Sequence, residues 1–547
     1  MSKRRIKISD DNINFINRTV LLFCIIMFCL AVSCINIFMI NMRHTQTVSD
    51  NNTSKTLILG DIRGSIYDTN IQKLVYNDYS YVCAVKPTVK SLSEIRDYID
   101  DEMYKIAYEN VSKQIPFLIN TDKEIKSENV VCEKIYKRYN DKQLAAHLIG
   151  YTDSTGHKGL CGVESAYDSL LESYSGTLKA RFLINGKGSV LLGGKVERIN
   201  ENYNSLGGVV LTLDKGFQRA LEESMDINGI KKGAAVILDI KTGGIVASVS
   251  RPNFNPNRIA DYLNDADSPL YNRVFAEYPV GSVFKPLVAA SALEQGIDPK
   301  AEYNCTGKIY DGNVGFGCVK SHGQVNMATA LINSCNCYFV DLINKIDYSQ
   351  LIDLASSLGF GNEIMLDEKI KTSAGNIPDI DELDSFAARG NFSFGQGNLT
   401  ATPIHIGVLY SMIANGGFYR KSYLINGYCD ENGVFKSKTE NKPPVRCISE
   451  KNSEILQDIL ELTVREGTGK SASVPGVEVA GKTATAQSGE YINGKERLVT
   501  WFAGFFPFEN PEYAAVIVCE DGLSGSNDCG PVFSELVQYY VSENYTF

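Results

Sequence analysis

The chain has 547 residues, of which 44% are hydrophobic and 22% are charged. This ordinary globular composition excludes wholesale disorder, and the length allows roughly three to four domains. The 54 basic and 64 acidic residues give a net charge of −10, so we expect no nucleic acid partner bound through a broad basic face. Because the chain has five histidines and no C-x-x-C pair, we also expect neither a metal site nor a cofactor.

An uncharged apolar run, Val20–Ile40, follows a basic amino end that includes Lys3, Arg4 and Arg5. As a helix it would be about 32 Å long, enough to cross a bilayer core of about 30 Å. The basic residues would keep the amino end in the cytoplasm and place the rest of the chain outside the membrane. The alternative is a cleaved signal peptide, or a lipoprotein modified at Cys34, although the apolar run continues past that residue. We therefore predict a single-pass cell-membrane protein with a cytoplasmic tail (1–19), a transmembrane helix (20–40) and a linker (41–56).

Three of the 14 cysteines lie in this apolar run, and the odd number in the rest of the chain cannot all pair within one molecule. Cys305 and Cys318 flank a short glycine-rich stretch, as do Cys519 and Cys529, so a disulfide could close each loop. The alternative is that these thiols stay reduced as small buried apolar residues. The sequence leaves both possibilities open.

Beyond the linker, the pattern of residues predicts an α+β fold. Short strand-like runs and charged helical stretches mix from about 57 to 205, and a strand then leads into an amphipathic helix from about 208. Residues 233–250 are typical of a β-hairpin with Lys241-Thr242-Gly243-Gly244 at its turn. Strands return at GVEVAGKTATAQ, LVTWFAGFFP and YAAVIVCE, so one sheet would form from both ends of this region. Helical stretches are expected at about 280–295, 325–345, 349–358, 403–415, 450–465 and 531–543.

Ser282 and Lys285 form the only Ser-x-x-Lys of the chain. If a helix begins near Gly281, the hydroxyl and the amine lie on one face, one turn apart. Desolvation lowers the pKa of an amine, and the neutral amine can then take the proton of the hydroxyl and make Ser282 a nucleophile. Taken alone, a serine at a helix N-terminus beside a surface lysine is the more ordinary explanation.

Two later segments carry groups that suit the same chemistry. Ser334-Cys335-Asn336 lies between helical stretches, where a second hydroxyl and an amide could point into one cleft. Lys482 lies in a β-run whose alternation places Thr483 and Thr485 on the opposite face. Sheet twist and the length of the lysine side chain can still let its ammonium reach a cleft at the edge of the sheet.

The order and spacing of SVFK, SCN and KTA resemble the Ser-x-x-Lys, Ser-x-Asn and Lys-Thr-Gly motifs of penicillin-binding proteins and serine β-lactamases. The flanking sequences narrow the resemblance to the class B penicillin-binding proteins, which are monofunctional peptidoglycan D,D-transpeptidases. These sequences are YPVGSVFKP, FSFGQG followed by ATP, GKTATAQ and WFAG, together with RGSIYD, LAAHLIGY and GLCGVES in the non-catalytic part. The resemblance implies an elongated pedestal (dimerisation) domain over 57–205 and a β-lactamase-like transpeptidase domain with a central antiparallel sheet over 206–547.

Carried over residue by residue, the resemblance implies a catalytic set at the first two motifs. Ser282 would be the acylated nucleophile and Lys285 its general base. Ser334 would relay a proton to the leaving D-Ala nitrogen. Asn336 would hydrogen-bond the donor peptide and position Lys285.

The third motif would bind the substrate. Lys482 would act with Thr483 and Thr485 on the terminal carboxylate through charge-assisted contacts. The backbone N–H groups of Ser282 and Thr485 would form the oxyanion hole. The family usually has glycine where this chain has Ala484, a substrate-binding position where a methyl group could crowd the substrate, so we expect altered specificity with retained activity.

The resemblance also implies partners. They are peptidoglycan stem peptides on lipid-linked or nascent glycan strands, β-lactam antibiotics, and a polytopic glycosyltransferase in the membrane. Three other functions stay open: a D,D-carboxypeptidase that passes the acyl group to water, a β-lactam sensor, and a non-enzymatic scaffold for the glycosyltransferase.

Two literal motif matches are misleading. Lys241-Thr242-Gly243 precedes the nucleophile and lies in the predicted hairpin turn. The segment from Gly476 to Thr483 matches the P-loop pattern, which should follow a strand and begin a helix. Because this segment alternates as a strand itself, we expect it to bind no nucleotide.

Overall fold

The computed structural model describes residues 20–36, 39, 53–191, 193–204, 206–440, 442–492 and 494–544. They form two compact units, each assembled from segments that alternate along the chain. The first unit contains the described residues of Met1–Gly60, Tyr81–Lys134 and Leu178–Asn200, and the second those of Asp61–Ser80, Ile135–Thr177 and Glu201–Phe547. The limits of the pedestal and transpeptidase domains at residues 57, 205 and 206 stay predictions.

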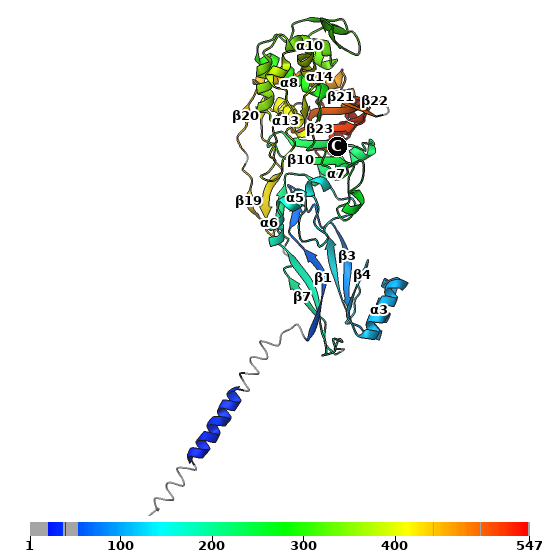
Figure 1. Cartoon of the computed structure of the whole chain (residues 1–547), viewed down its shortest axis with the longest axis vertical. Helices are drawn as coiled ribbons and strands as arrows, with labels where there is room; N and C mark the ends of the chain where they lie inside the picture. Colours follow the sequence, from blue (N-terminus) through cyan, green and yellow to red (C-terminus); the bar gives the residue numbers. More distant parts are fainter. Residues whose placement is uncertain are drawn as a thin grey trace, which may run out of the picture. The chain divides into compact units, whose positions relative to one another are not determined.

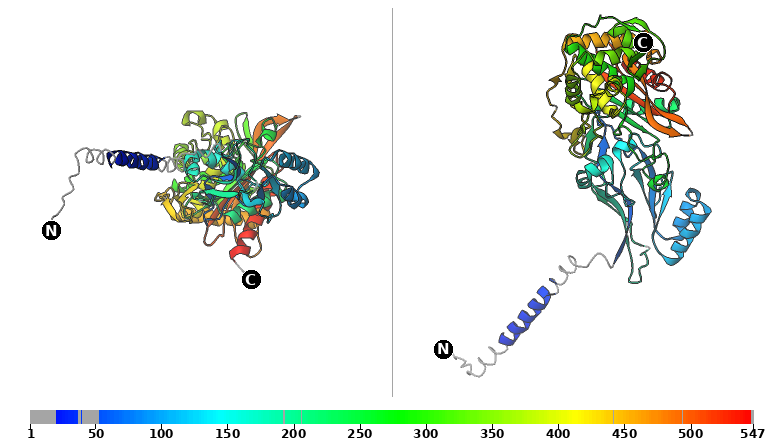
Figure 2. Two further views of the ribbon diagram at one scale, coloured as in Figure 1. Left: turned by 90° about the horizontal axis from the view of Figure 1, so that it is seen from below. Right: turned by 45° about the horizontal axis from the view of Figure 1, so that its top comes forward.

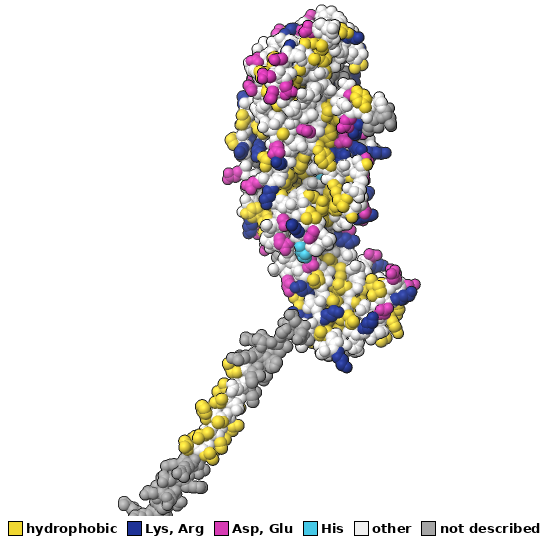
Figure 3. All heavy atoms as spheres, viewed as in Figure 1, with side chains coloured by type: hydrophobic (Ala, Val, Ile, Leu, Met, Phe, Trp, Pro, Cys, Tyr) yellow, Lys and Arg dark blue, Asp and Glu magenta, His cyan; other side chains and the backbone are white. Residues whose placement is uncertain are grey.

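A helix covers residues 20–36 and exposes apolar side chains along its length, as the yellow segment in Figure 3 shows. Among the residues that the structure describes, no helix combines the length and the apolar character needed to cross a membrane. The predicted cytoplasmic tail (1–19), part of the predicted span (37, 38 and 40) and most of the predicted linker (41–52) lie outside the described residues.

The first unit is built mainly from two three-stranded sheets, in the orders β1–β6–β7 and β4–β3–β5. In one buried cluster, Leu92 and Ile95 of α2 (Val89–Ile95) pack against Phe117 and Ile119 of β4 (Phe117–Thr121). Asp100 caps the next helix by accepting a hydrogen bond from the N–H of Met103. The elements are β1 (Ser54–Ile62), β3 (Asp78–Val85), α2 (Val89–Ile95), α3 (Asp101–Lys113), β4 (Phe117–Thr121), β5 (Val130–Lys137), β6 (Gly176–Leu183) and β7 (Glu197–Glu201).

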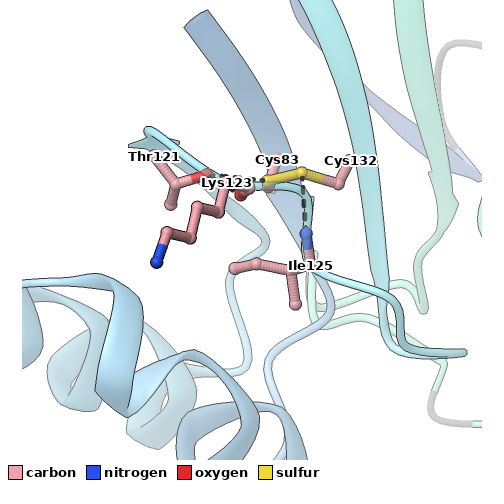
Figure 4. Close-up of a disulfide and its surroundings, with 5 residues drawn as sticks. All are labelled: Cys83, Thr121, Lys123, Ile125 and Cys132. Carbon is pink, nitrogen blue, oxygen red and sulfur yellow. Dashed lines mark hydrogen bonds between the residues drawn. A yellow bond between two sulfur atoms is a disulfide. The ribbon is translucent and has the colours of Figure 1, made fainter.

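Cys83 of β3 and Cys132 of β5 form a disulfide between neighbouring strands (Figure 4). The hydroxyl of Thr121 and the amide of Ile125 lie beside its two sulfur atoms. The sequence predicts no disulfide between these two cysteines. The four cysteines that could close loops are free thiols in the structure: Cys305, Cys318, Cys519 and Cys529.

A five-stranded antiparallel sheet forms the centre of the second unit, in the order β10–β9–β23–β22–β21 (Figure 1). Its strands are β9 (Gly233–Asp239), β10 (Ile245–Arg251), β21 (Ala480–Ile492), β22 (Lys495–Phe506) and β23 (Tyr513–Glu520). The pairing of β9 with β23 joins the beginning and the end of this region, as predicted. The long strands β21 and β22 lie side by side in Figure 2, drawn in orange. The sheet and the helices between its strands confirm the α+β fold class.

Helices cover both faces of this sheet. Phe217 and Leu221 from one helix join Phe533 from another and Phe502 of β22 in a buried cluster on one face. The opposite face is covered by a helix that is buried along its whole length, where Gly407 allows close approach to the sheet. The helices on the first face are α7 (Lys215–Ile227) and α16 (Gly530–Asn544), and the second face holds α13 (Pro403–Ala414) with α8 (Lys285–Glu294) and α14 (Glu450–Arg465) nearby.

The predicted helices of this region are all present, with one interruption. The stretch predicted as helical over 325–345 is divided into α9 (Met327–Ile332) and α10 (Asn336–Ile343), and α11 (Tyr348–Ser357) follows. The division occurs at Ser334, whose φ of +56° is incompatible with a continuing right-handed helix. This interruption lies at the Ser-x-Asn motif.

Candidate active site

Ser282 lies in η4 (Gly281–Phe284), a 3₁₀ turn that leads directly into α8. Gly281 has φ +65°, a conformation that favours glycine. A Cβ atom at this position would lie 3.2 Å from the methyl group of Ala486 and 3.3 Å from that of Ala484. The absence of a side chain therefore lets η4 approach β21 closely, which places Ser282 beside the edge strand of the sheet.

Ser334 and Asn336 lie at the turn between α9 and α10, next to this serine. The hydroxyl of Ser334 donates a hydrogen bond of 3.0 Å to Ser282 Oγ. Asn336 is the first residue of α10, and its Nδ2 donates to the carbonyl of Gly317 at 3.1 Å. The structure therefore brings the first two predicted motifs into direct contact.

Lys285 is fully buried and connects these groups. Its Nζ donates to the Ser334 carbonyl at 2.9 Å, to Ser334 Oγ at 3.2 Å and to Asn336 Oδ1 at 2.7 Å. Burial lowers the pKa of Lys285 from 10.5 to about 7, because the charged ammonium is poorly solvated at this position. The neutral amine is thus well populated near neutral pH, and Ser334 Oγ links it to Ser282 Oγ.

Lys482 is fully buried on β21, the edge strand. Its Nζ donates to Thr468 Oγ1 at 3.2 Å and to the Thr483 carbonyl at 3.1 Å. Burial, and secondly the nearby charge of Lys285, lower the pKa of Lys482 well below its ordinary value. Thr485 is exposed, as expected for a side chain on the face opposite to the buried lysine.

Ala484, the residue that departs from the family pattern, is only 3% exposed. Its methyl group lies on the side of β21 that faces η4, within packing distance of Gly281. The methyl group therefore fills the space between the strand and the nucleophile turn. This position gives no support to the idea that it crowds a bound substrate.

Two contacts of the site were not expected from the sequence. Thr468 follows α14 between Gly467 and Gly469, and these glycines mark only a turn. Gly317, which accepts the hydrogen bond from Asn336, ends a short strand without any motif. The backbone oxyanion donors at Ser282 and Thr485 stay predictions.

Both misleading motifs have the predicted local structure. Lys241-Thr242-Gly243 lies at the turn that joins β9 to β10. The segment that matches the P-loop pattern enters β21 at Ala480, and both Lys482 and Thr483 lie within that strand. Because no helix begins there, the segment lacks the geometry that cradles a phosphate.

A group of side chains that could hold a metal ion includes Cys335 of the Ser-x-Asn motif. Cys305, Cys318, His322 and Cys335 place their ligand atoms within 4.8 Å of one another. The expectation of no metal site did not anticipate this group of side chains. It relied on closely spaced cysteine pairs, whereas folding gathers these residues from well-separated positions of the chain.

The comparisons with known proteins agree with the three motifs. The family model of the penicillin binding protein transpeptidase domain matches residues 233–538, more than half of the chain. The chain is 31% identical over 449 residues to the peptidoglycan D,D-transpeptidase FtsI homolog of Mesostigma viride, across 74% of this chain and 72% of that relative. It is 28% identical over 516 residues to stage V sporulation protein D of Bacillus subtilis, across 87% and 77% of the two chains.

A solved structure shares the fold. Penicillin binding protein 3 from Mycobacterium tuberculosis, crystallised in complex with aztreonam, superposes with a TM-score of 0.65 at 23% identity. The match covers 90% of this chain and 98% of that structure. With its three motifs gathered around Ser282 and more than half of its length matched by the family model, the chain belongs to the penicillin-binding protein transpeptidase family and, within it, to class B.

Proposed function

We propose that the chain is a peptidoglycan D,D-transpeptidase that cross-links stem peptides through an acyl-enzyme on Ser282. The observation that carries this proposal is the hydrogen-bonded series from Ser282 Oγ through Ser334 Oγ to Lys285 Nζ, beside the edge strand β21. Such a series supplies a nucleophile, a route for its proton and a base with a lowered pKa.

In the acylation step, Ser282 Oγ attacks the carbonyl carbon of the penultimate D-Ala of a donor stem peptide. The hydroxyl proton passes to the neutral amine of Lys285, directly or through Ser334. The C–N bond then breaks, and Ser334 returns a proton to the leaving D-Ala nitrogen. Backbone N–H groups of Ser282 and Thr485 would stabilise the oxyanion, each contributing about 3 kcal/mol.

The edge position of β21 supports the proposed binding mode of the donor. An extended peptide can add to an unpaired strand edge through main-chain hydrogen bonds. The terminal carboxylate would then lie near Lys482, Thr483 and Thr485, where a negative charge would favour the protonated form of the buried lysine. The β-lactam ring, a strained amide beside a carboxylate, would occupy the same place and acylate Ser282.

The experiment that tests this function compares the fate of one donor under two conditions. The full chain in detergent is incubated with a stem peptide ending in D-Ala-D-Ala, with and without an acceptor amine, and the products are identified by mass spectrometry. A cross-linked product with release of D-Ala is the expected result. A donor with an amidated C-terminus is the control, and it should react poorly because it has no carboxylate for Lys482.

Each other outcome identifies one of the alternatives. Release of D-Ala at the same rate with and without acceptor, and no cross-link, would show a carboxypeptidase. Stable β-lactam labelling without turnover of any peptide would show a sensor. A folded chain that gives neither an adduct nor a product would be a scaffold.

We also propose that the apolar run 20–40 anchors the chain in the cell membrane, with residues 1–19 in the cytoplasm. Its uncharged composition and the preceding basic residues support this arrangement. Residues 57–205 would form the pedestal and residues 206–547 the extracytoplasmic transpeptidase domain, working with a polytopic glycosyltransferase. We expect a reporter fused after residue 547 to lie outside the cytoplasm, and a soluble mature chain beginning near residue 35–50 would contradict the anchor.

A further inference from the structure

Four side chains from separate elements converge beside the Ser-x-Asn motif. Cys305 ends β12 (Tyr303–Cys305), and His322 directly precedes β15 (Gly323–Val325), its partner strand. Cys318 follows a small hairpin, and Cys335 directly precedes α10. A strand pair, a hairpin and the start of a helix therefore bring together the four ligand atoms, which lie within 4.8 Å of one another.

Three of the six separations between these ligand atoms match the edges of a metal-centred tetrahedron. The sulfur atoms of Cys305 and Cys318 are 3.8 Å apart, and those of Cys318 and Cys335 are 3.7 Å apart. The sulfur of Cys305 lies 3.5 Å from Nδ1 of His322. Zinc bonds of about 2.3 Å to sulfur and about 2.0 Å to nitrogen give tetrahedral edges of about 3.8 Å between sulfurs and about 3.5 Å between sulfur and nitrogen.

We propose that Cys305, Cys318, His322 and Cys335 bind one Zn²⁺ ion in a structural site. Three thiolates and one neutral imidazole are a typical closed zinc ligand set, and soft sulfur ligands favour this ion over Mg²⁺ or Ca²⁺. Binding would release three thiol protons and requires no oxidant or reductant. A disulfide between Cys305 and Cys318 would use two sulfurs and leave the convergence of His322 and Cys335 unexplained.

Cys337 supports the site from outside the proposed ligand set. Its backbone N–H donates to the Cys318 sulfur at 3.4 Å, an interaction that stabilises a thiolate. Its own sulfur lies 3.4 Å from that of Cys318 and also contacts the carbonyl of Phe316. The first turn of α10 therefore contributes both a ligand, at Cys335, and a donor to another ligand.

The metal would hold the catalytic turn in place. Cys335 lies between Ser334, with its left-handed φ of +56°, and Asn336. On the other side, the carbonyl of Gly317, the residue before Cys318, accepts the hydrogen bond from Asn336 Nδ2. The ion would thus tie together the two segments that position the Ser334 and Asn336 contacts to Lys285. This positioning role rests on the proposed function, whereas zinc binding does not.

Metal content tests the binding. The full chain, purified in detergent without chelators or metal-affinity resin, should contain about one zinc per chain by inductively coupled plasma mass spectrometry. Cys305→Ser and His322→Ala should lose most of the zinc, whereas His322→Cys, which keeps four ligands, should retain it. Cys447→Ser is the matched control, because this free thiol lies outside the cluster and should leave the zinc content unchanged.

Three results would overturn the site. They are a chain without zinc in which peptide mapping finds a Cys305–Cys318 disulfide, a chain that holds iron in place of zinc, and zinc that stays at full content in both Cys305→Ser and His322→Ala.

Removal of the zinc with a chelator tests the proposed positioning role separately from zinc binding itself. Treatment with 1,10-phenanthroline should release the zinc, expose Cys305 to alkylation and slow penicillin acylation by about tenfold or more, with recovery when Zn²⁺ is added back. Unchanged acylation after complete zinc release would refute the positioning role alone. A zinc-loaded chain that never forms an adduct would refute the proposed function and leave the metal site standing.

Discussion

Replacement of Ser282 by alanine should abolish covalent labelling of the chain by penicillin. The variant lacks the oxygen that attacks the β-lactam carbonyl, and the nearest hydroxyl, Ser334 Oγ, lies 3.0 Å from the position of that oxygen and accepts a hydrogen bond from Lys285 Nζ. Loss of a catalytic nucleophile lowers rates by at least about ten-thousandfold in comparable serine enzymes. Incubation of the full chain with labelled penicillin, followed by peptide mapping, measures the effect and should place the wild-type adduct on Ser282.

Ser291→Ala is the matched control for this variant. Ser291 lies on the same helix, α8, and is buried, and its hydroxyl accepts a hydrogen bond of 3.0 Å from the side chain of Gln295. Its labelling should equal that of the wild type. An adduct that persists in Ser282→Ala, or that maps to another residue, would contradict the assignment of the nucleophile, and rapid release of the label by the wild type would indicate a β-lactamase.

The rate of penicillin acylation should rise with pH and level off above a midpoint near pH 7. The base must be the neutral amine of Lys285, and burial lowers the pKa of this group to about 7, so the neutral form predominates above that pH. One unit below the midpoint the rate should be about tenfold lower than the plateau, since about a tenth of the amine is neutral there. With its ordinary pKa of 10.5, Lys285 would give no plateau in the neutral range.

Burial is the main cause of this low midpoint, and the charged and titratable groups around Lys285 modify it. Lys482 lies close enough for the two charges to interact, while the thiols of Cys318, Cys335 and Cys337 oppose the fall in pKa when ionised. Lys285→Arg is the informative variant, because it keeps a positive charge but stays protonated throughout this range. It should lose acylation at every pH tested. A flat profile for the wild type between about pH 6 and 8, or an active arginine variant, would contradict the role of Lys285 as base.

Much of the site could be predicted because its residues lie in short local patterns. Ser282 and Lys285 are three positions apart, and the helix that carries them starts close to the predicted place, where both residues contact Ser334. The strand that carries Lys482 was also predictable, since alternating small and β-branched residues indicate a strand, and that excluded a phosphate-binding loop. In these segments, neighbouring residues in the sequence determine both the secondary structure and the chemical groups that it carries.

The parts that could not be predicted depend on contacts between distant segments. The turn at Ser334 divides a stretch whose composition favours one continuous helix, and only the packing around Lys285 shows why a left-handed residue is needed there. The disulfide from Cys83 to Cys132 depends on which strands become neighbours. Similarly, no metal-binding motif marks Cys305 and Cys335, because their common site exists only once strand pairing has brought the segments together.

The edge strand β21 has a consequence for the behaviour of the chain at high concentration. A strand that keeps its outer hydrogen-bonding groups free for a substrate also offers a template to any other extended chain, including a second copy of itself. Charges near the end of the β21–β22 pair oppose such association: Arg497 forms ion pairs with Glu490 and Asp521 there. Changes that make the exposed end of this strand pair less charged would therefore favour aggregation even where the nucleophile is untouched.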